Sequence, residues 1–169
     1  DITISSGDTT GTATFTPTDD NLYETSTDET ATVSITGVSG GSATESGSHS
    51  VTLTIEENES PPTVTLSTSA TSIDENSGSS LTLTATLSVA TTADVTVTIA
   101  TSGTATEGTD YTDGSGNIDD LVISAGNTTE TISFKPTDDS VYEGDETATI
   151  SIDSVSGGEA SENGTQAVT

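Results

Sequence analysis

The sequence predicts an all-β fold made of β-sandwich modules in tandem. Thr supplies 39 of the 169 residues, and Thr favours strands over long helices. Several segments alternate apolar and polar residues, which is typical of strands with one buried and one hydrated face. Gly, Asn and Asp separate these segments, as in the turns of a sandwich.

The expected strands with this alternation are, in chain order, residues 50–56, 80–89, 94–99, 131–135 and 147–153. In the second of them Leu81, Leu83, Ala85, Leu87 and Val89 share one face, and Thr or Ser occupies the other. Composition alone resembles a disordered acidic chain, because Leu, Ile, Val and Phe number only 31 and the net charge is −27. The sustained alternation excludes disorder of the whole chain.

A long internal repeat predicts the domain organisation. Residues 4–24 align with 123–143 and residues 28–52 with 145–169, with 29 identities in 46 pairs. A period near 119 residues exceeds that of solenoid repeats and fits sandwich domains of about 100 residues. We therefore expect residues 1–59 to be the C-terminal half of one module and residues 60–62 to be a Pro-containing linker. Residues 63–169 would form a nearly complete module that lacks most of its last strand.

The composition excludes several classes of function. Lys135 is the only basic residue, which argues against binding to nucleic acid or to anionic membrane surfaces. No apolar run approaches the ~20 residues of a membrane span. No signal peptide is present, so we expect the chain to be a mature piece or a fragment. The chain has no Cys and one His, His49, whose repeat equivalent is Gln166. We therefore expect no enzymatic activity.

Acidic residues gather in the turns and at strand ends. In a sandwich, alternate loops meet at one end, where converging carboxylates repel one another unless a cation or protons neutralise them. Oxygen ligands without His or Cys favour Ca²⁺, with Mg²⁺ as the weaker candidate. The alternative is that these acids only solubilise the turns.

The chain resembles the Calx-beta domain family, over residues 63–169 as one module and over residues 1–59 as the second half of another. The resemblance is carried by the segments Ser72–Gly78, Gly103–Tyr111, Ile123–Gly126 and Pro136–Glu146. It implies an immunoglobulin-like antiparallel β-sandwich. Members include calcium-sensing domains of sodium–calcium exchangers, and long tandem arrays in large bacterial surface or secreted proteins.

The resemblance also implies calcium ligands. By position in the family motifs these are Glu75, Asp110, Asp138, Asp139 and Glu143 in the second module, and Asp19, Asp20, Glu24, Glu56 and Glu57 in the first. The early Glu and the Asp-Tyr segment of the first module, and the closing acids of the second, are absent from the sequence, so neither ligand set is full.

We expect a Ca²⁺-stiffened spacer or fibre module of an adhesive extracellular or cell-surface protein. Its expected partners are neighbouring repeats, or other copies of the chain that complete its sheets by strand complementation. The alternatives are a Ca²⁺-sensing regulatory domain of a transporter and a carbohydrate-binding sandwich. The repeat also makes Tyr23 and Tyr142 equivalent. Either could form the tyrosine corner of such a sandwich, but we expect a packing role for both.

Overall fold

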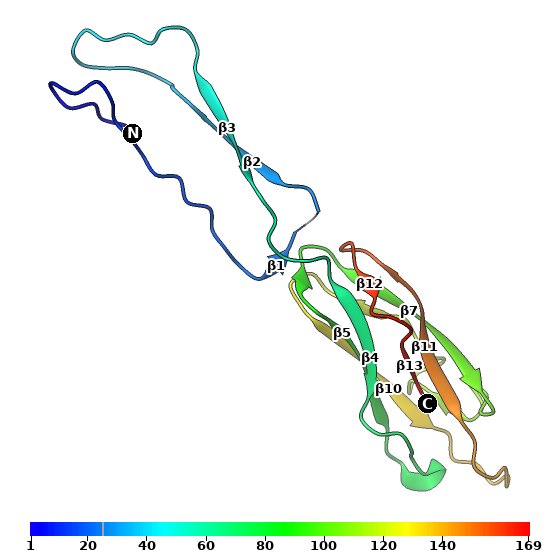
Figure 1. Ribbon diagram of the computed structural model, residues 1–169. Helices are drawn as coiled ribbons and strands as arrows, with labels where there is room; N and C mark the ends of the chain where they lie inside the picture. Colours follow the sequence, from blue (N-terminus) through cyan, green and yellow to red (C-terminus); the bar gives the residue numbers. More distant parts are fainter. Residues whose placement is uncertain (25) are drawn as a thin grey trace. The chain divides into compact units, whose positions relative to one another are not determined.

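The computed structural model describes residues 1–24 and 26–169, which divide into two compact units (Figure 1). The first unit contains Asp1–Asp20 and Thr30–Ile55, and the second contains Asn21–Glu29 and Glu56–Thr169. The segment Asn21–Glu29 therefore belongs to the second unit, although the repeat assigns it to the first copy. The module boundaries expected from the repeat remain a prediction.

Two sheets form the body of the second unit. In spatial order, the five-stranded sheet contains β12 (Ser161–Glu162), β4 (Thr63–Thr68), β5 (Leu81–Leu87), β10 (Thr129–Pro136) and β8 (Tyr111–Thr112). The four-stranded sheet contains β13 (Ala167–Val168), β11 (Ala148–Ser156), β7 (Val95–Gly103) and β9 (Leu121–Ile123). Neighbouring strands are antiparallel except β12 and β4, which run parallel. The register of β11 against β7 shifts between Ile152 and Ser154.

The hydrophobic core lies where the alternating strands turn their apolar faces inward. The buried cluster is made of Val64, Leu66, Leu83, Ala85, Leu87, Val95, Val97, Tyr111, Leu121, Ile123, Ile150 and Ile152. The ring of Tyr111 stacks on Phe134 with a centroid distance of 4.6 Å. The predicted all-β sandwich is confirmed, because the period-two residues of β5, β7 and β11 supply the core.

A third, two-stranded parallel sheet belongs to the second unit, and among the described residues its strands pair with neither main sheet. It joins β1 (Leu22–Tyr23) to β6 (Ala90–Thr91), with Tyr23 opposite Thr91. Tyr23 is only 1% exposed, whereas its repeat equivalent Tyr142 is 97% exposed. The expected packing role is therefore right for Tyr23 and wrong for Tyr142.

The first unit contains a two-stranded sheet in which β2 (Glu29–Ser34, whose first residue lies in the second unit) pairs with β3 (Ser50–Ile55). Most of its large apolar side chains, among them Phe15, Val33 and Ile35, are exposed, whereas Leu53 and Ile55 are half-buried. Among the described residues, every buried hydrophobic side chain lies in the second unit. The second unit thus contains the folded core, and it also carries the acidic loops considered next.

The sole helical element of the described chain is the 3₁₀ turn η1 (Glu75–Ser77), which is followed by the C-cap Gly78. Across residues 1–24 and 26–169, no helix is long and apolar enough to cross a membrane.

Candidate metal site

Strand pairing brings Asp110 beside the acidic loop 137–147. At the end of β10, Pro136 pairs with Tyr111 of β8 and Lys135 pairs with Thr112. The Thr137 amide then donates a hydrogen bond of 2.9 Å to the Asp110 carbonyl oxygen. At its other end, the loop is held by Thr147, whose carbonyl oxygen accepts the amides of Thr104 and Ala105 at 2.8 and 3.0 Å. The loop is therefore fixed at both ends by the segment 103–112.

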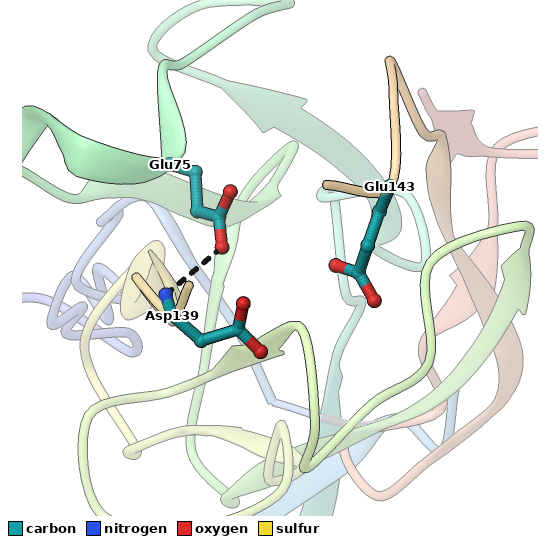
Figure 2. A group of neighbouring side chains, drawn as sticks. All are labelled: Glu75, Asp139 and Glu143. Atoms are coloured by element: carbon teal, nitrogen blue, oxygen red, sulfur yellow. Dashed lines mark hydrogen bonds between the residues drawn. The ribbon is translucent and has the colours of Figure 1, made fainter. Parts of the chain in front are cut away.

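The turn η1 contributes a third segment to this end of the sandwich. The Glu75 carboxylate accepts the Asp139 amide at 3.2 Å, and the Asp139 carboxylate accepts the Val141 amide at 2.6 Å. Figure 2 shows Glu75 bonded to Asp139, with the carboxylate of Glu143 directed toward them. Backbone hydrogen bonds thus orient two of these carboxylates, as in the Asx turns of loops.

Five carboxylates form two overlapping groups. Glu75, Asp139 and Glu143 make up one group, in which the nearest oxygens all lie within 4.8 Å of one another. Asp110, Glu143 and Glu146 make up the second by the same measure. Because Glu143 belongs to both groups, it is the central acid of the cluster.

The electrostatics of the cluster are repulsive. Partial desolvation, and then the negative charges of Asp110, Asp139, Glu146 and Glu75, raise the pKa of Glu143 above its ordinary value of 4.5. Such a shift means that the ionised form is disfavoured at this position. A bound cation would reverse this balance.

An open cavity of about 900 Å³ adjoins the cluster. Its acidic wall contains Glu75, Asp110, Asp138, Asp139, Glu143, Asp145 and Glu146. Its apolar wall contains Leu81, Leu83, Phe134, Ile150 and Val168. The cavity therefore extends from the acidic loops to the core edge beside β13.

The donor set is suited to a hard cation. All five clustered side chains offer carboxylate oxygens, no thiol or imidazole is among them, and they come from three segments that backbone hydrogen bonds hold together. Oxygen-only sites of this kind are typical of Ca²⁺, which accepts irregular arrangements, and less so of Mg²⁺, which requires near-octahedral geometry.

The structure brings together four of the five acids expected in the second module: Glu75, Asp110, Asp139 and Glu143. Asp138 lines the cavity and is in neither group. Sequence reasoning missed Glu146. The signal for it was present in the run Glu143-Gly144-Asp145-Glu146, which places three acids in one loop.

The acids expected as ligands in the first module do not form such a group within the described part of the chain. Asp19 and Asp20 lie in the first unit, whereas Glu24, Glu56 and Glu57 lie in the second. The Glu57 carboxylate accepts the amides of Glu24 and Glu59 at 3.0 and 2.9 Å, and these bonds lower its pKa. The structure thus gives Glu57 a local role in holding the backbone.

Two other acids, Asp113 and Glu107, hold the chain around Asp110 by hydrogen bonds. Asp113 accepts the amides of Ser115 and Gly116 and the Ser115 hydroxyl, and these bonds lower its pKa. Glu107 accepts the Thr101 hydroxyl at 2.9 Å and the Ile118 amide. These residues order the segment that carries Asp110 rather than adding to the two groups.

Comparison with known proteins agrees with this architecture. The Calx-beta domain family matches residues 57–169. This is a non-catalytic family known for Ca²⁺ binding. No curated protein and no solved structure gives a significant match to the chain. Since the match covers well over half of the residues and falls on the sandwich just described, the chain belongs to the Calx-beta domain family.

Proposed function

We propose that residues 57–169 form a Ca²⁺-binding structural module, used as a spacer in an extracellular or cell-surface adhesive protein. The observation that supports Ca²⁺ binding is the convergence of five carboxylates from three segments, with the pKa of the shared Glu143 raised. Repelling acids held in place by backbone hydrogen bonds are a site in which a divalent cation gains affinity.

Glu75, Asp139 and Glu143 would hold one ion, and Asp110 and Glu146 with the shared Glu143 would hold a second. The bound cation would supply charge neutralisation and cross-linking. The residues themselves tie η1, the segment before β8 and the loop 137–147 together at one end of the sandwich. Binding at such a site stabilises the folded state over the unfolded one.

The role as a spacer rests on composition and repetition. The chain repeats itself with 29 identities in 46 aligned pairs, and it carries one basic residue against 28 acidic ones. A stiff, strongly acidic module repeated along a chain keeps its neighbours apart by charge repulsion. Cation binding at the sandwich end would reduce local fraying of the loops.

We also propose neighbouring repeats, or further copies of the chain, as partners through strand complementation. The support is the apolar part of the cavity lining, which includes Phe134 and Ile150 together with Val168 of the two-residue strand β13. In the first copy, the residues that follow the equivalent of Thr169 are Leu53-Thr54-Ile55, which alternate as a strand should. A peptide of residues 51–59 should bind this edge, and binding that survives replacement of Leu53 and Ile55 by Ser would contradict the proposal.

Thermal unfolding with Ca²⁺ and with excess chelator tests the metal site. Ca²⁺ at about 100 times its dissociation constant adds about 2.7 kcal/mol to the free energy of unfolding. At about 2–8 °C per kcal/mol, the melting temperature should rise by roughly 5–20 °C. Coinciding curves under the two conditions would refute Ca²⁺ binding, and a response to Mg²⁺ alone would reassign the ion.

Three variants test where the ion binds. Glu143→Gln removes the carboxylate common to both groups and should abolish most of the Ca²⁺-dependent shift. Asp145→Asn removes the same charge from the same loop, but Asp145 belongs to neither group, so it should keep the shift. The double variant Asp138→Asn/Asp139→Asn should lose the part of the shift that comes from the first group, while keeping its β-sheet circular dichroism. Equal losses in Glu143→Gln and Asp145→Asn would indicate a diffuse charge effect instead of a site.

A further inference from the structure

Tyr23 occupies a complete docking site within the second unit. Tyr23 is the second residue of β1, which pairs with β6 so that Leu22 lies opposite Ala90 and Tyr23 opposite Thr91. The Thr92 amide donates to the Tyr23 carbonyl at 3.2 Å, and the Thr92 hydroxyl donates to the Glu24 carbonyl at 3.1 Å. Tyr23 is only 1% exposed and is among the most deeply buried large residues of the unit.

The far end of the ring meets a carboxylate. The Tyr23 hydroxyl donates to Glu159, whose carboxylate also accepts the Ser26 amide at 3.1 Å and the Ser26 hydroxyl at 3.0 Å. The bond to Glu159 raises the pKa of Tyr23, and the same bond lowers the pKa of Glu159. A buried Tyr whose hydroxyl is paired is typical of the anchor residue of an interface.

The turn that presents Glu159 is built to receive such an anchor. Gly157 and Gly158 have φ of 90° and 54°, a region that L side chains rarely adopt. A Cβ at Gly158 would lie 2.8 Å from the Thr91 hydroxyl and 3.0 Å from a Val95 methyl group. The two glycines therefore let the turn lie directly against β6 and the start of β7, so that Glu159 reaches the Tyr23 hydroxyl.

The second copy of the repeat carries the same anchor in exposed form. The alignment of residues 4–24 with 123–143 places Val141-Tyr142 at the positions of Leu22-Tyr23. Tyr142 is 97% exposed and Val141 is also exposed. An exposed aromatic side chain beside an exposed aliphatic one, in a loop that is otherwise acidic and glycine-containing, indicates a contact surface.

We propose that Tyr142 is the anchor by which the second module docks onto a following module of the same repeat. The receiving site would be a β6-like strand with Thr and a Gly-Gly turn that presents an acceptor for the Tyr hydroxyl. We place the receiving module after the one that carries Tyr142 because Tyr23 also precedes the residues that receive it, Thr91 and Glu159, in the chain. This inference rests on the proposed array and extends it by naming the contact.

The acceptor position gives the contact specificity. In the first copy the equivalent turn is Gly40-Gly41-Ser42, with Ser42 at φ 55° where Glu159 has φ 53°. A module with the first copy's turn therefore offers the Ser hydroxyl to the docking Tyr, where the second copy offers the Glu159 carboxylate. Ser26 lies in the segment 25–27, which the second copy shortens to Gly144, so the bonds from Ser26 are specific to the first junction. The Tyr and its acceptor are the parts that recur.

Tyrosine nitration in an extended chain tests the proposal. Thr52 and Thr169 are equivalent in the repeat, so a second copy of residues 53–169 added after Thr169 continues it in register. Tyr142 of the added copy is replaced by Phe, which leaves one Tyr142 to follow by mass spectrometry. Its nitration should slow by about tenfold or more relative to the 169-residue chain, because docking must open before the ring reacts.

Glu159→Ala in the added copy is the matched control and should restore most of the reactivity of Tyr142. Tyr111, which is 2% exposed, reports folding of each module in the same experiment. If Tyr142 is nitrated equally fast in both chains while both copies of Tyr111 stay protected, the docking proposal is wrong. Because the assay is run with chelator as well as with Ca²⁺, its outcome is separate from that of the metal site.

A second measurement uses the 169-residue chain alone. The double variant Asn21→Ser/Leu22→Val gives the Tyr23 segment the residues that precede Tyr142. If the receiving site accepts the second copy's sequence, Tyr23 stays protected from nitration in this variant. Reactivity of Tyr23 equal to that of Tyr142 would show that the site excludes the second copy's sequence, and it would overturn the proposal.

Discussion

Replacing Gly157 by Ala should destabilise the second unit far more than an ordinary Gly→Ala change at positive φ. Gly157 has φ 90°, and a Cβ there would lie 2.1 Å from the carbonyl oxygen of Asp94. The neighbouring Val95 is fully buried in the core. The clash is with the backbone at the start of β7, so no side-chain rotation can relieve it.

The expected cost has two parts. An L side chain in the left-handed region costs about 1–2 kcal/mol, and forcing atoms into a packed site adds about 1–3 kcal/mol. The sum for Gly157→Ala is therefore about 2–5 kcal/mol. Gly126 is the matched control in the same unit, because it has φ 80° and nothing lies within 4 Å of its Cβ position. Gly126→Ala should show only the first part.

Urea unfolding followed by circular dichroism measures the free energy of unfolding of both variants. The dependence of this free energy on urea concentration should be the same in both, because it reports the surface exposed on unfolding. Gly157→Ala should also increase the nitration of Tyr23, because the turn that carries Glu159 must shift. Equal stabilities of the two variants, within about 0.5 kcal/mol, would refute the steric reasoning. Such a result would mean that the backbone at Asp94 yields at little cost.

Three further predictions concern the acidic cluster, the docking site and the core. Since the pKa of Glu143 is raised, metal-free protein should gain stability as pH falls through that pKa, and Glu143→Gln should flatten this gain in a series of thermal melts. The lowered pKa of Glu159 has the opposite sign: its contribution is complete above the ordinary value of 4.5 and is lost as pH falls through the folded value. The protection factor of the Tyr23 amide, corrected for the intrinsic exchange rate at each pH, should therefore fall on acidification in the wild type but not in Glu159→Gln. Finally, Ile123→Ala, in the buried core, should cost about 2–5 kcal/mol in urea unfolding, whereas the exposed neighbour Val122→Ala should change stability by less than about 0.5 kcal/mol.

The sandwich could be predicted because its long strands bury every second residue. The expected strand 80–89 corresponds to β5, and the expected strand 147–153 lies within the span of β11 apart from its first residue. In both, alternation alone fixes which face enters the core. The two-residue strands β1, β6, β12 and β13 are too short for any period, and they depend on contacts between residues far apart in the sequence.

The acidic site was predictable to the level of the loop and not of each side chain. Asp139 joins a group because its backbone is held by Glu75, whereas the adjacent Asp138 is in neither group. Glu146 belongs to the second group because the adjacent Thr147 is hydrogen-bonded to Thr104 and Ala105, in the segment after β7. The difference between Tyr23 and Tyr142 is of the same kind, since similar local sequences give a buried side chain at Tyr23, which is bonded to Glu159, and an exposed one at Tyr142.

The end of β10 has a consequence for protease resistance. Lys135 is the only Lys or Arg in the chain, and it is followed directly by Pro136, which pairs with Tyr111. Trypsin-like proteases cleave after basic residues but act poorly when proline follows. Resistance to them should therefore persist after the chain has been unfolded by heating, where protection by folding is lost, and elastase-type enzymes should then cut freely.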